Sequence, residues 1–432
     1  MKFEKKRLGD VADIIGGGTP STKIADHWDG TIPWLTPKDL SSFDGIYVTR
    51  GARSLTESGF SASSAKLLPK GAVLYTSRAP IGYVAIADSP IATNQGFKSL
   101  VLKKGYVPEF LFYLLKASKA EIETHASGGT FAEISAKAFS DVALPFPPEI
   151  YQSKVAEILL GLDKKIQANK QISKTLEDIA QTIFKSWFID FDPVKAKMAG
   201  EKPVGMNAAT AALFPDSMED SELGLIPKGW TWGAIGDIAE VIDCLHSKKP
   251  LLLEEGFPYL QLDTISDSGV LQYDKAGKIS DEDYQKWTAR IEVADGDCLI
   301  TNVGRVGAVS QVSGHFRAAI GRNITAIRPI KKEAYKTFLI AALTSDFMGK
   351  EITRNTDSGT ILEALNVRSI PKLRIPNAGD ELLTSYEIVC GPMWNQMHEL
   401  YRQNVTLAIL RDSLLPRLIS GELLIPAEML AS

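Results

Sequence analysis

The chain has 432 residues, of which 44% are hydrophobic and 23% are charged. This composition excludes a disordered chain, and the length predicts roughly two to four domains. No apolar run approaches the ~20 residues that a membrane helix needs. Three scattered cysteines and the absence of a signal-peptide pattern favour a soluble cytoplasmic protein without a disulfide framework.

The formal net charge of −4 is unevenly distributed along the chain. Residues 1–148 carry 17 Lys and Arg against 14 Asp and Glu, and residues 226–377 carry 19 of each kind. The acidic excess therefore lies in residues 149–225 and 378–432. Because nucleic-acid binding depends on local charge, DNA-reading faces are permitted on the other two segments.

Residues 1–148 combine short strand patterns such as "AVLYTS", "GYVAIA" and "SLVL" with the helix pattern "PEFLFYLLKASKAEIE". From Gln152 to Phe188 the only Gly or Pro is Gly161, and apolar residues recur at heptad spacing. This pattern predicts a spacer helix of ~37 residues, on the order of 55 Å long, with a coiled-coil seam. The seam comprises Leu162, Ile166, Asn169, Leu176, Ile183 and Trp187.

Residues 193–225 are rich in Pro, Gly, Ala and acidic residues, which indicates a partly ordered linker. Residues 226–377 again mix strand patterns with one helix pattern. A second helical segment, residues 378–432, closes the chain. Its predicted seam residues are Met393, Leu400, Leu407 and Leu414, with Asn404 one turn along.

The second half of the chain repeats the first. "RLGDVADII" (7–15) returns as "AIGDIAEVI" (234–242), and "KGAVLYTSRAPIGYVAI" (70–86) returns as "DGDCLITNVGRVGAVSQ" (295–311). The matched segments keep their order at nearly constant separation, for example 227 residues between Gly9 and Gly236. We therefore expect two similar α+β domains, 1–148 and 226–377, each followed by a spacer helix, 149–192 and 378–432.

Two arrangements of the spacer helices are possible. Each helix could be one arm of an ordinary helical bundle. Alternatively, the two helices pair as an antiparallel coiled coil that separates the α+β domains, with pseudo-twofold symmetry. Asn169 and Asn404 are equivalent positions, 235 residues apart, and in such a pair they would fix the register through hydrogen bonds. The internal duplication favours the coiled coil.

The sequence contains little that resembles catalytic machinery. It has no GxxxxGK[ST] phosphate loop, no GxGxxG and no adenine-methylation tetrapeptide, and Pro215-Asp216 begins no complete nuclease motif. The five histidines form no pair at ligand spacing, so we expect no metal site. These absences indicate a binding protein rather than a catalyst.

Polar residues recur at the ends of the predicted strands in both domains. Arg, Asn and Gln can pair bidentately with base edges, whereas Lys, Ser, Thr and Gly-Thr amides can hold phosphates. Each residue alone could simply cap a strand, but matched placement in two diverged copies favours DNA contact. The candidates are Thr36, Lys38, Thr76, Ser77, Arg78, Asn94, Gln95, Lys98, Gly129 and Thr130, and then Ser247, Lys248, Asn302, Arg305, Arg322, Asn323, Gly359, Thr360 and Arg368.

Several segments resemble one known family. "LDKKIQANKQISKTLEDIAQTIFKSWFIDFDPVKAK" (162–197) and "AALFPDSMEDSELGLIPKGW" (211–230) are similar to the central region of type I restriction–modification specificity subunits. "LGDVADIIGGGTPS", "YTSRAPIGYVAI" and "ATNQGF" are also typical of these subunits. The resemblance extends over nearly the whole chain. The chain departs from the family's usual pattern after both domains, at "PPEIYQSKV" and at "PNAGDELLTSYEIV". The second of these lacks the usual second Pro and Gln and leaves the start of the second spacer helix undefined.

The resemblance implies two target recognition domains that read the halves of a bipartite double-stranded DNA site, which should be asymmetric because the domains differ. It implies that the spacer helices set the gap between half-sites and that the chain holds no cofactor. Two methyltransferase subunits would bind S-adenosylmethionine and methylate adenine, and restriction subunits would use ATP and Mg²⁺. The alternative function is a coiled-coil scaffold with two protein-binding domains and no DNA reading.

Overall fold

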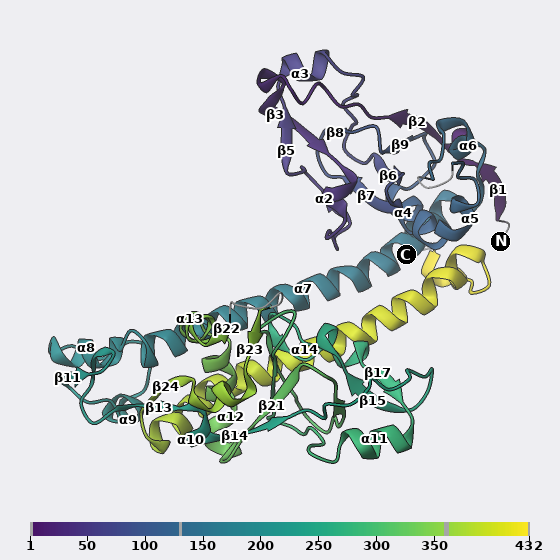
Figure 1. The fold of residues 1–432 in the computed structure, drawn as a ribbon. Coiled ribbons are helices and arrows are strands. Elements are labelled where there is room, and N and C mark those ends of the chain that lie inside the picture. The colour runs from purple at the N-terminus through teal and green to yellow at the C-terminus, as the bar shows by residue number, and fades with distance from the viewer. Residues whose placement is uncertain (1–2, 129–131, 358–362, 431–432) are drawn as a thin grey trace. The chain divides into compact units, whose positions relative to one another are not determined.

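The computed structural model describes residues 3–128, 132–357 and 363–430. The chain divides into two compact units, Met1–Gln167 with Thr406–Ser432, and Ala168–Val405 (Figure 1). Each unit contains one α+β domain together with part of each long helix. Among the described residues, no helix is both long enough and apolar enough to cross a membrane.

The α+β domain of the first unit contains two main sheets, with strand orders β2-β9-β6-β7-β4 and β5-β3-β8, and the short pair β1-β10. The strands are β1 (Glu4–Arg7), β2 (Ala12–Gly16), β3 (Trp28–Leu35), β4 (Tyr47–Val48), β5 (Arg53–Leu55), β6 (Val73–Ser77), β7 (Ile81–Ala87), β8 (Ala92–Thr93), β9 (Lys98–Leu102) and β10 (Ala143–Phe146). The helices are α1 (Leu8–Val11), η1 (Ala25–His27), α2 (Pro37–Leu40), α3 (Glu57–Ser61), α4 (Pro108–Ala117), α5 (Lys119–Glu123) and α6 (Ala136–Asp141). Helix α4 is almost entirely buried, because its run of apolar residues packs against the larger sheet.

The domain of the second unit has the same topology, with strand orders β14-β21-β18-β19-β16, β17-β15-β20 and β13-β24. Its strands are β13 (Thr231–Ala234), β14 (Ala239–Asp243), β15 (Phe257–Leu260), β16 (Gly269–Val270), β17 (Gly277–Ile279), β18 (Cys298–Thr301), β19 (Val309–Gln311), β20 (Ala319–Ile320), β21 (Ile324–Pro329), β22 (Thr356–Asp357), β23 (Ala364–Leu365) and β24 (Arg374–Asn377). The helices are α10 (Ile235–Ile238), η2 (Leu262–Thr264), η3 (Tyr273–Lys275), α11 (Asp281–Trp287), α12 (Lys332–Leu343), α13 (Asp346–Arg354) and η4 (Val367–Lys372).

The registers of the two domains confirm the internal repeat. Ala12 pairs with Leu102 across β2 and β9, and Ala239 pairs with Pro329 across β14 and β21. "RLGDVADII" and "AIGDIAEVI" therefore form the same short helix and edge strand in each copy. The repeated phrase belongs to the framework of the fold.

The segment between the first spacer helix and the second domain is structured. It contains α8 (Asp192–Met198), α9 (Ala208–Ala212) and the hairpin of β11 (Met218–Ser221) and β12 (Gly224–Pro227). Phe191, Val194, Phe214 and Ile226 are buried in the same core as the second domain. This burial accounts for the apolar residues within the acidic, Pro-rich segment.

The two long helices are α7 (Glu149–Phe188) and α14 (Asp380–Ser420), of 40 and 41 residues. In the second unit Tyr386 Oη donates to the Ala180 carbonyl at 3.2 Å, and in the first unit Arg411 pairs with Asp163. The earlier residue of α7, Asp163, therefore contacts the later residue of α14, and the later residue, Ala180, contacts the earlier one. This order confirms that the two helices are antiparallel. The second helix begins at Asp380, a point that its sequence left undefined.

The predicted seam is buried to different degrees. Ile166, Trp187 and Leu400 are buried, whereas the remaining apolar positions are half-buried; these are Leu162, Leu176, Ile183, Met393, Leu407 and Leu414. Asn169 is fully buried, and its Nδ2 donates to Asn404 Oδ1 at 3.0 Å. The two equivalent asparagines therefore bind each other, as predicted.

Candidate nucleic-acid interface

A parallel strand pair brings two loops together in the first domain. Strand β3 pairs with β8 in parallel, Trp34 opposite Ala92 and Leu35 opposite Thr93, and both strands end there. The Asn94 backbone N–H donates to the Leu35 carbonyl at 2.9 Å. Residues 36–38 and 94–96 therefore lie side by side, and we call them the first edge. Four predicted DNA contacts, Thr36, Lys38, Asn94 and Gln95, belong to it.

The second domain repeats this arrangement with different residues. Strand β15 pairs with β20 in parallel, Tyr259 opposite Ala319, and the Gly321 N–H donates to the Leu260 carbonyl at 2.8 Å. Residues 261–263 and 321–323 form the second edge, which includes the predicted Arg322 and Asn323. A hollow of about 540 Å³ lies here, lined in part by Lys249, Gln261, Arg322 and Asn323.

Lys249 and Gln261 are not among the DNA contacts predicted from the sequence. Gln261 is the first residue after its parallel strand, as Thr36 is in the first domain. Aligning the two copies at this strand end would have identified Gln261. Lys249 comes from the loop after β14, and no sequence pattern connects it to the edge.

The exposed side chains differ between equivalent positions of the two edges. Gln95 and Arg322 are each the second residue after the parallel strand, and both are exposed. Lys38 is also exposed and is replaced at the second edge by Asp263. The same backbone frame thus presents different hydrogen-bonding groups.

Neighbouring residues hold the first edge in place. The Thr36 N–H and hydroxyl both donate to Asp39 Oδ2, at 2.7 and 2.6 Å, and this contact fixes the start of α2. Asn94 Oδ1 accepts from the Gly96 N–H at 2.9 Å, and the Thr19 hydroxyl donates to Gln95 Oε1. Thr36 and Asn94 therefore shape the edge, while Lys38 and Gln95 project from it.

Three predicted DNA contacts are interior residues. Thr76 and Ser77 are fully buried, and Asn302 is 5% exposed. The Thr76 hydroxyl donates to the Pro80 carbonyl and accepts from the Tyr83 N–H, both at 2.8 Å. Asn302 Nδ2 donates to Thr325 Oγ1 at 2.9 Å. The prediction of DNA contact is corrected for these side chains, because the strand ends turn them inward to hold the hairpins.

Arg78 and Lys98 gather around one carboxylate. Arg78 Nη1 lies 3.2 Å and Lys98 Nζ 3.4 Å from Glu133, and Lys98 is largely buried. A cavity of about 570 Å³ opens beside Arg78 and Glu133. Since Glu133 offsets one of the two positive charges, this cluster is a weaker phosphate site than the sequence suggested. Gly129 and Thr130 lie outside the described residues.

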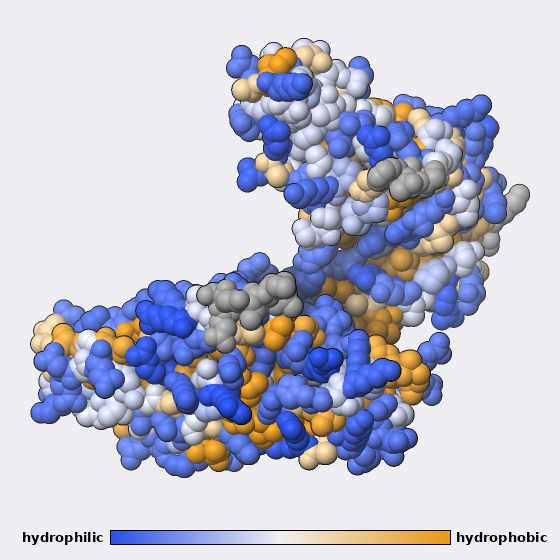
Figure 2. All heavy atoms as spheres, in the orientation of Figure 1, coloured by the Kyte–Doolittle hydropathy of each residue, from blue (hydrophilic) through white to orange (hydrophobic). Residues whose placement is uncertain are grey.

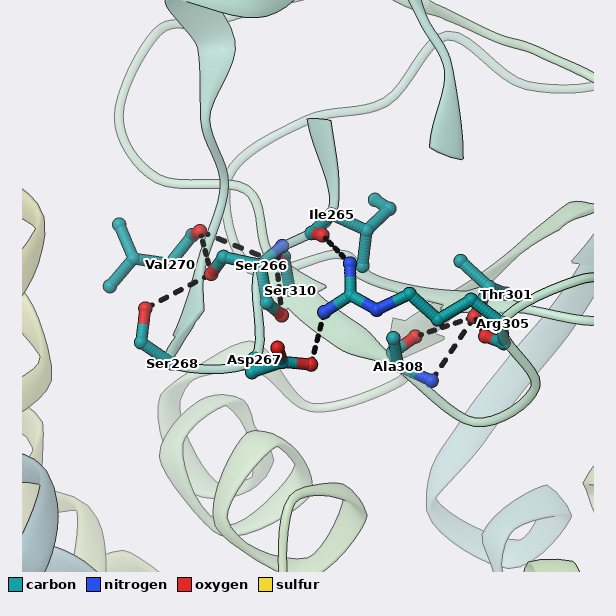
Figure 3. Close-up of polar contacts among 9 residues, drawn as sticks. All are labelled: Ile265, Ser266, Asp267, Ser268, Val270, Thr301, Arg305, Ala308 and Ser310. Carbon is teal, nitrogen blue, oxygen red and sulfur yellow. Dashed lines mark hydrogen bonds and ion pairs between the residues drawn. The ribbon is translucent and has the colours of Figure 1, made fainter. Parts of the chain in front are cut away.

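Arg305 holds the loop between β18 and β19 through side-chain contacts (Figure 3). Its Nη1 donates to the Ile265 carbonyl at 2.7 Å, and its Nη2 pairs with Asp267. Thr301 Oγ1 accepts from the Ala308 N–H at 3.1 Å across the base of the same loop. Arg305 therefore links the β18–β19 connection to the segment before β16. Asp267 is 89% exposed, so a phosphate could replace it as the partner of Arg305.

The remaining predicted contacts of the second domain come from two further segments among the described residues. Ser247 and Lys248 follow β14 and precede Lys249, and Lys248 is exposed. Arg368 is exposed at the start of η4, where its N–H donates to Asn366 Oδ1 at 3.0 Å. Gly359 and Thr360 are not among the described residues. Hydrophilic and hydrophobic residues both appear on the visible face of the molecule (Figure 2).

One group of side chains has the chemistry of a metal site. Ligand atoms of Asp243, Cys244 and His246 all lie within 4.8 Å of one another. No metal was predicted from the sequence, because the chain has neither a histidine pair nor a Cys/His cluster at zinc spacing; this group combines one histidine with a cysteine and a carboxylate.

Comparison with known proteins identifies relatives of this chain. Residues 1–178 match the family model described as the type I restriction modification DNA specificity domain. The chain is 32% identical over 430 residues to the type I restriction enzyme MjaIX specificity subunit of Methanocaldococcus jannaschii, covering 98% of this chain and 93% of that protein. It is 26% identical over 411 residues to the HindI specificity subunit of Haemophilus influenzae, covering 83% of this chain and 88% of that protein.

The fold is similar to that of a type I restriction–modification S subunit from M. genitalium, known from a crystal structure. The TM-score is 0.60 at 16% sequence identity, and the alignment covers 97% of this chain and 96% of the other. At this identity the likeness concerns the fold alone.

Proposed function

The chain belongs to the type I restriction enzyme specificity subunits, and on that premise we propose that it reads a bipartite, asymmetric DNA site with two separate domains. The observation that carries this proposal is the pair of equivalent edges with different exposed side chains. Gln95 projects from the first edge where Arg322 projects from the second. A shared frame with different reading groups is what recognition of two different half-sites requires.

The chemistry of each edge suits base reading beside phosphate binding. The Arg322 guanidinium can donate two parallel hydrogen bonds to guanine O6 and N7. The Gln95 amide can donate and accept at adenine N6 and N7. Lys38 and Lys249 are exposed beside these groups and suit phosphate oxygens, which position the protein without specifying sequence.

We assign α7 and α14 the role of a spacer that sets the distance between half-sites. The chain itself supplies no reacting group in this proposal. Two methyltransferase subunits carry S-adenosylmethionine, and restriction subunits with ATP and Mg²⁺ complete the assembly. The specificity subunit positions the methyltransferase subunits on the DNA and so determines which adenine each of them methylates.

Genome-wide mapping of methyladenine in the host tests this proposal. Arg322→Ala should relax the preference at one base pair of one half-site, equivalent to ~1–3 kcal/mol of lost discrimination. Gln95→Ala should act only on the other half-site. Arg317→Ala is the control, because Arg317 is an exposed arginine of the second domain that pairs with Glu292.

Two outcomes would count against the proposed function. Equal effects of Arg322→Ala on both half-sites would make Arg322 a structural residue. An assembled complex that binds the methyltransferase but shows no sequence-specific gel shift would favour the scaffold function instead.

A further inference from the structure

We propose that Asp243, Cys244 and His246 form a binding site for one zinc ion at the end of β14. The three residues lie within four positions of the chain, and each contributes one ligand atom to a group with a 4.8 Å span. Such a site goes beyond DNA reading, and its existence does not depend on the proposed function.

The ligand atoms need only small shifts, some inward and one outward, to hold the ion. Zinc bonds of ~2.0–2.3 Å in a tetrahedron place ligand atoms ~3.3–3.8 Å apart. His246 Nε2 already lies 2.7 Å from Asp243 Oδ2. The His246 side chain is 62% exposed and can rotate away from the carboxylate to admit the metal. Three protein ligands leave the fourth position to water.

The carboxylate has an oxygen that the protein leaves unsatisfied. Asp243 Oδ1 is shielded from solvent and accepts no hydrogen bond within the described part of the chain. A buried acceptor without a hydrogen-bond partner destabilises the folded state. A cation bound by this carboxylate would offset that cost.

Cys244 is buried, and the backbone N–H groups of Asn323 and Ile324 face its sulfur. With zinc in place, the repulsion between carboxylate and thiolate is replaced by attraction of both to the ion, and the thiol proton leaves to solvent. The two N–H groups then act as outer-shell donors to the sulfur.

The donor set selects zinc over the hard cations. Magnesium and calcium prefer shells made of oxygen, whereas a sulfur, an imidazole nitrogen and one carboxylate oxygen are typical zinc ligands. The site also adjoins the second edge, because Asn323 belongs to both. A bound ion would therefore tie the loop of Ser247 and Lys248 to the end of β14.

The test uses the full chain stripped of metal with a chelator. Zinc is titrated in competition with a chromophoric chelator, and cobalt replaces it for absorption spectroscopy. We expect one equivalent of metal and a thiolate-to-cobalt charge-transfer band. Cys244→Ser should abolish the band, and His246→Ala should weaken zinc binding by at least roughly tenfold.

Matched controls come from residues outside the group. Cys298→Ala and His315→Ala should retain the band and the affinity, since Cys298 is a buried cysteine and His315 an exposed histidine of the same domain. Because His246 is exposed, His246→Ala should fold even if Cys244→Ser does not. The proposal is overturned if the chain binds no stoichiometric metal, or if both Cys244→Ser and His246→Ala bind as tightly as the unmodified chain.

Discussion

The hydrogen-bonded pair of the buried Asn169 and the half-buried Asn404 couples the two long helices. Asn169 is inaccessible to solvent, and its amide donates to Asn404 at 3.0 Å and to Gln403 at 3.4 Å. We expect Asn169→Ala to destabilise the protein by about 1 kcal/mol through the lost hydrogen bond. Replacing both Asn169 and Asn404 by Leu should recover or exceed the original stability at the expense of a defined register.

Denaturant unfolding of the single and double variants measures this coupling. An interaction energy of roughly 0.5 kcal/mol or more between the two sites is expected for residues in contact. Gln171→Leu serves as the control, because Gln171 is exposed on α7. Strictly additive single and double variants would show that the pair contributes nothing.

Asp295 gives a second prediction, on acid stability. Although burial raises its pKa, Lys332, the Gly314 N–H and Lys336 together lower the pKa to about 2 from 3.8. A carboxyl whose pKa is lower in the folded state stabilises the protein above its unfolded pKa, and this stabilisation is lost as the pH falls from about 4 to 2. Asp295→Asn should therefore cost about 2 kcal/mol at neutral pH, and the cost should shrink towards pH 2.

Thermal unfolding across this pH range measures the effect. Glu254→Gln, on an exposed loop of the same domain, should leave the pH profile unchanged. A difference between Asp295→Asn and the original chain that is constant with pH would locate the effect in packing rather than in charge.

At the residue scale, the sequence predicted where the strands end but not whether the polar side chains at those ends point outward or inward. Arg322 and Gln95 project outward, while Thr76 and Asn302 sit at similarly polar strand ends and point inward. The difference depends on hairpin contacts, such as Thr76 to Pro80, that join the strand to its own turn. Polar residue type alone does not distinguish a side chain that can contact DNA from one that hydrogen-bonds within its own hairpin.

At the element scale, periodicity predicted most of the structure. The long helices, the strand-rich domains and the repeat follow from patterns that span many residues, which local propensity and burial both support. The parallel pairing of β3 with β8 could not be predicted, because Leu35 and Thr93 are distant in sequence and each strand pattern is short. That pairing creates the first edge, so the candidate site was only partly predictable.

The spacer hypothesis is tested at the element scale. Removing one heptad from α7 together with the facing heptad of α14 shortens the pair by about 10 Å. This length corresponds to roughly three base pairs at about 3.4 Å each. We expect the unread gap between half-sites to shorten while both half-site sequences remain intact, as read by methyladenine mapping.

Removing a heptad from one helix alone is the control. It breaks the Asn169–Asn404 register and should abolish methylation rather than alter the gap. An unchanged gap after the paired deletion would refute the spacer role of the helices.

For the whole molecule, the proposed function means that two tethered reading domains bind more selectively than either alone. Binding of one half-site raises the effective concentration of the other domain at its own half-site. Errors in both halves then add in free energy, at ~1–3 kcal/mol for each mismatched base pair.

An asymmetric site follows from the two different edges, and exchanging residues 36–38 and 94–96 for their equivalents in the second domain should make the site more symmetric.

The charge of the whole chain leads to the last prediction, on DNA affinity. The two α+β domains are close to neutral, at 17 basic and 14 acidic residues in one and 19 of each in the other. Because phosphate contacts dominate affinity and give a salt dependence proportional to their number, the isolated chain should bind DNA weakly and with a shallow salt dependence. Adding methyltransferase subunits should increase both the affinity and the steepness. The same pure chain should neither methylate nor cleave DNA, and tight, steeply salt-dependent binding by the chain alone would place most phosphate contacts on this subunit instead.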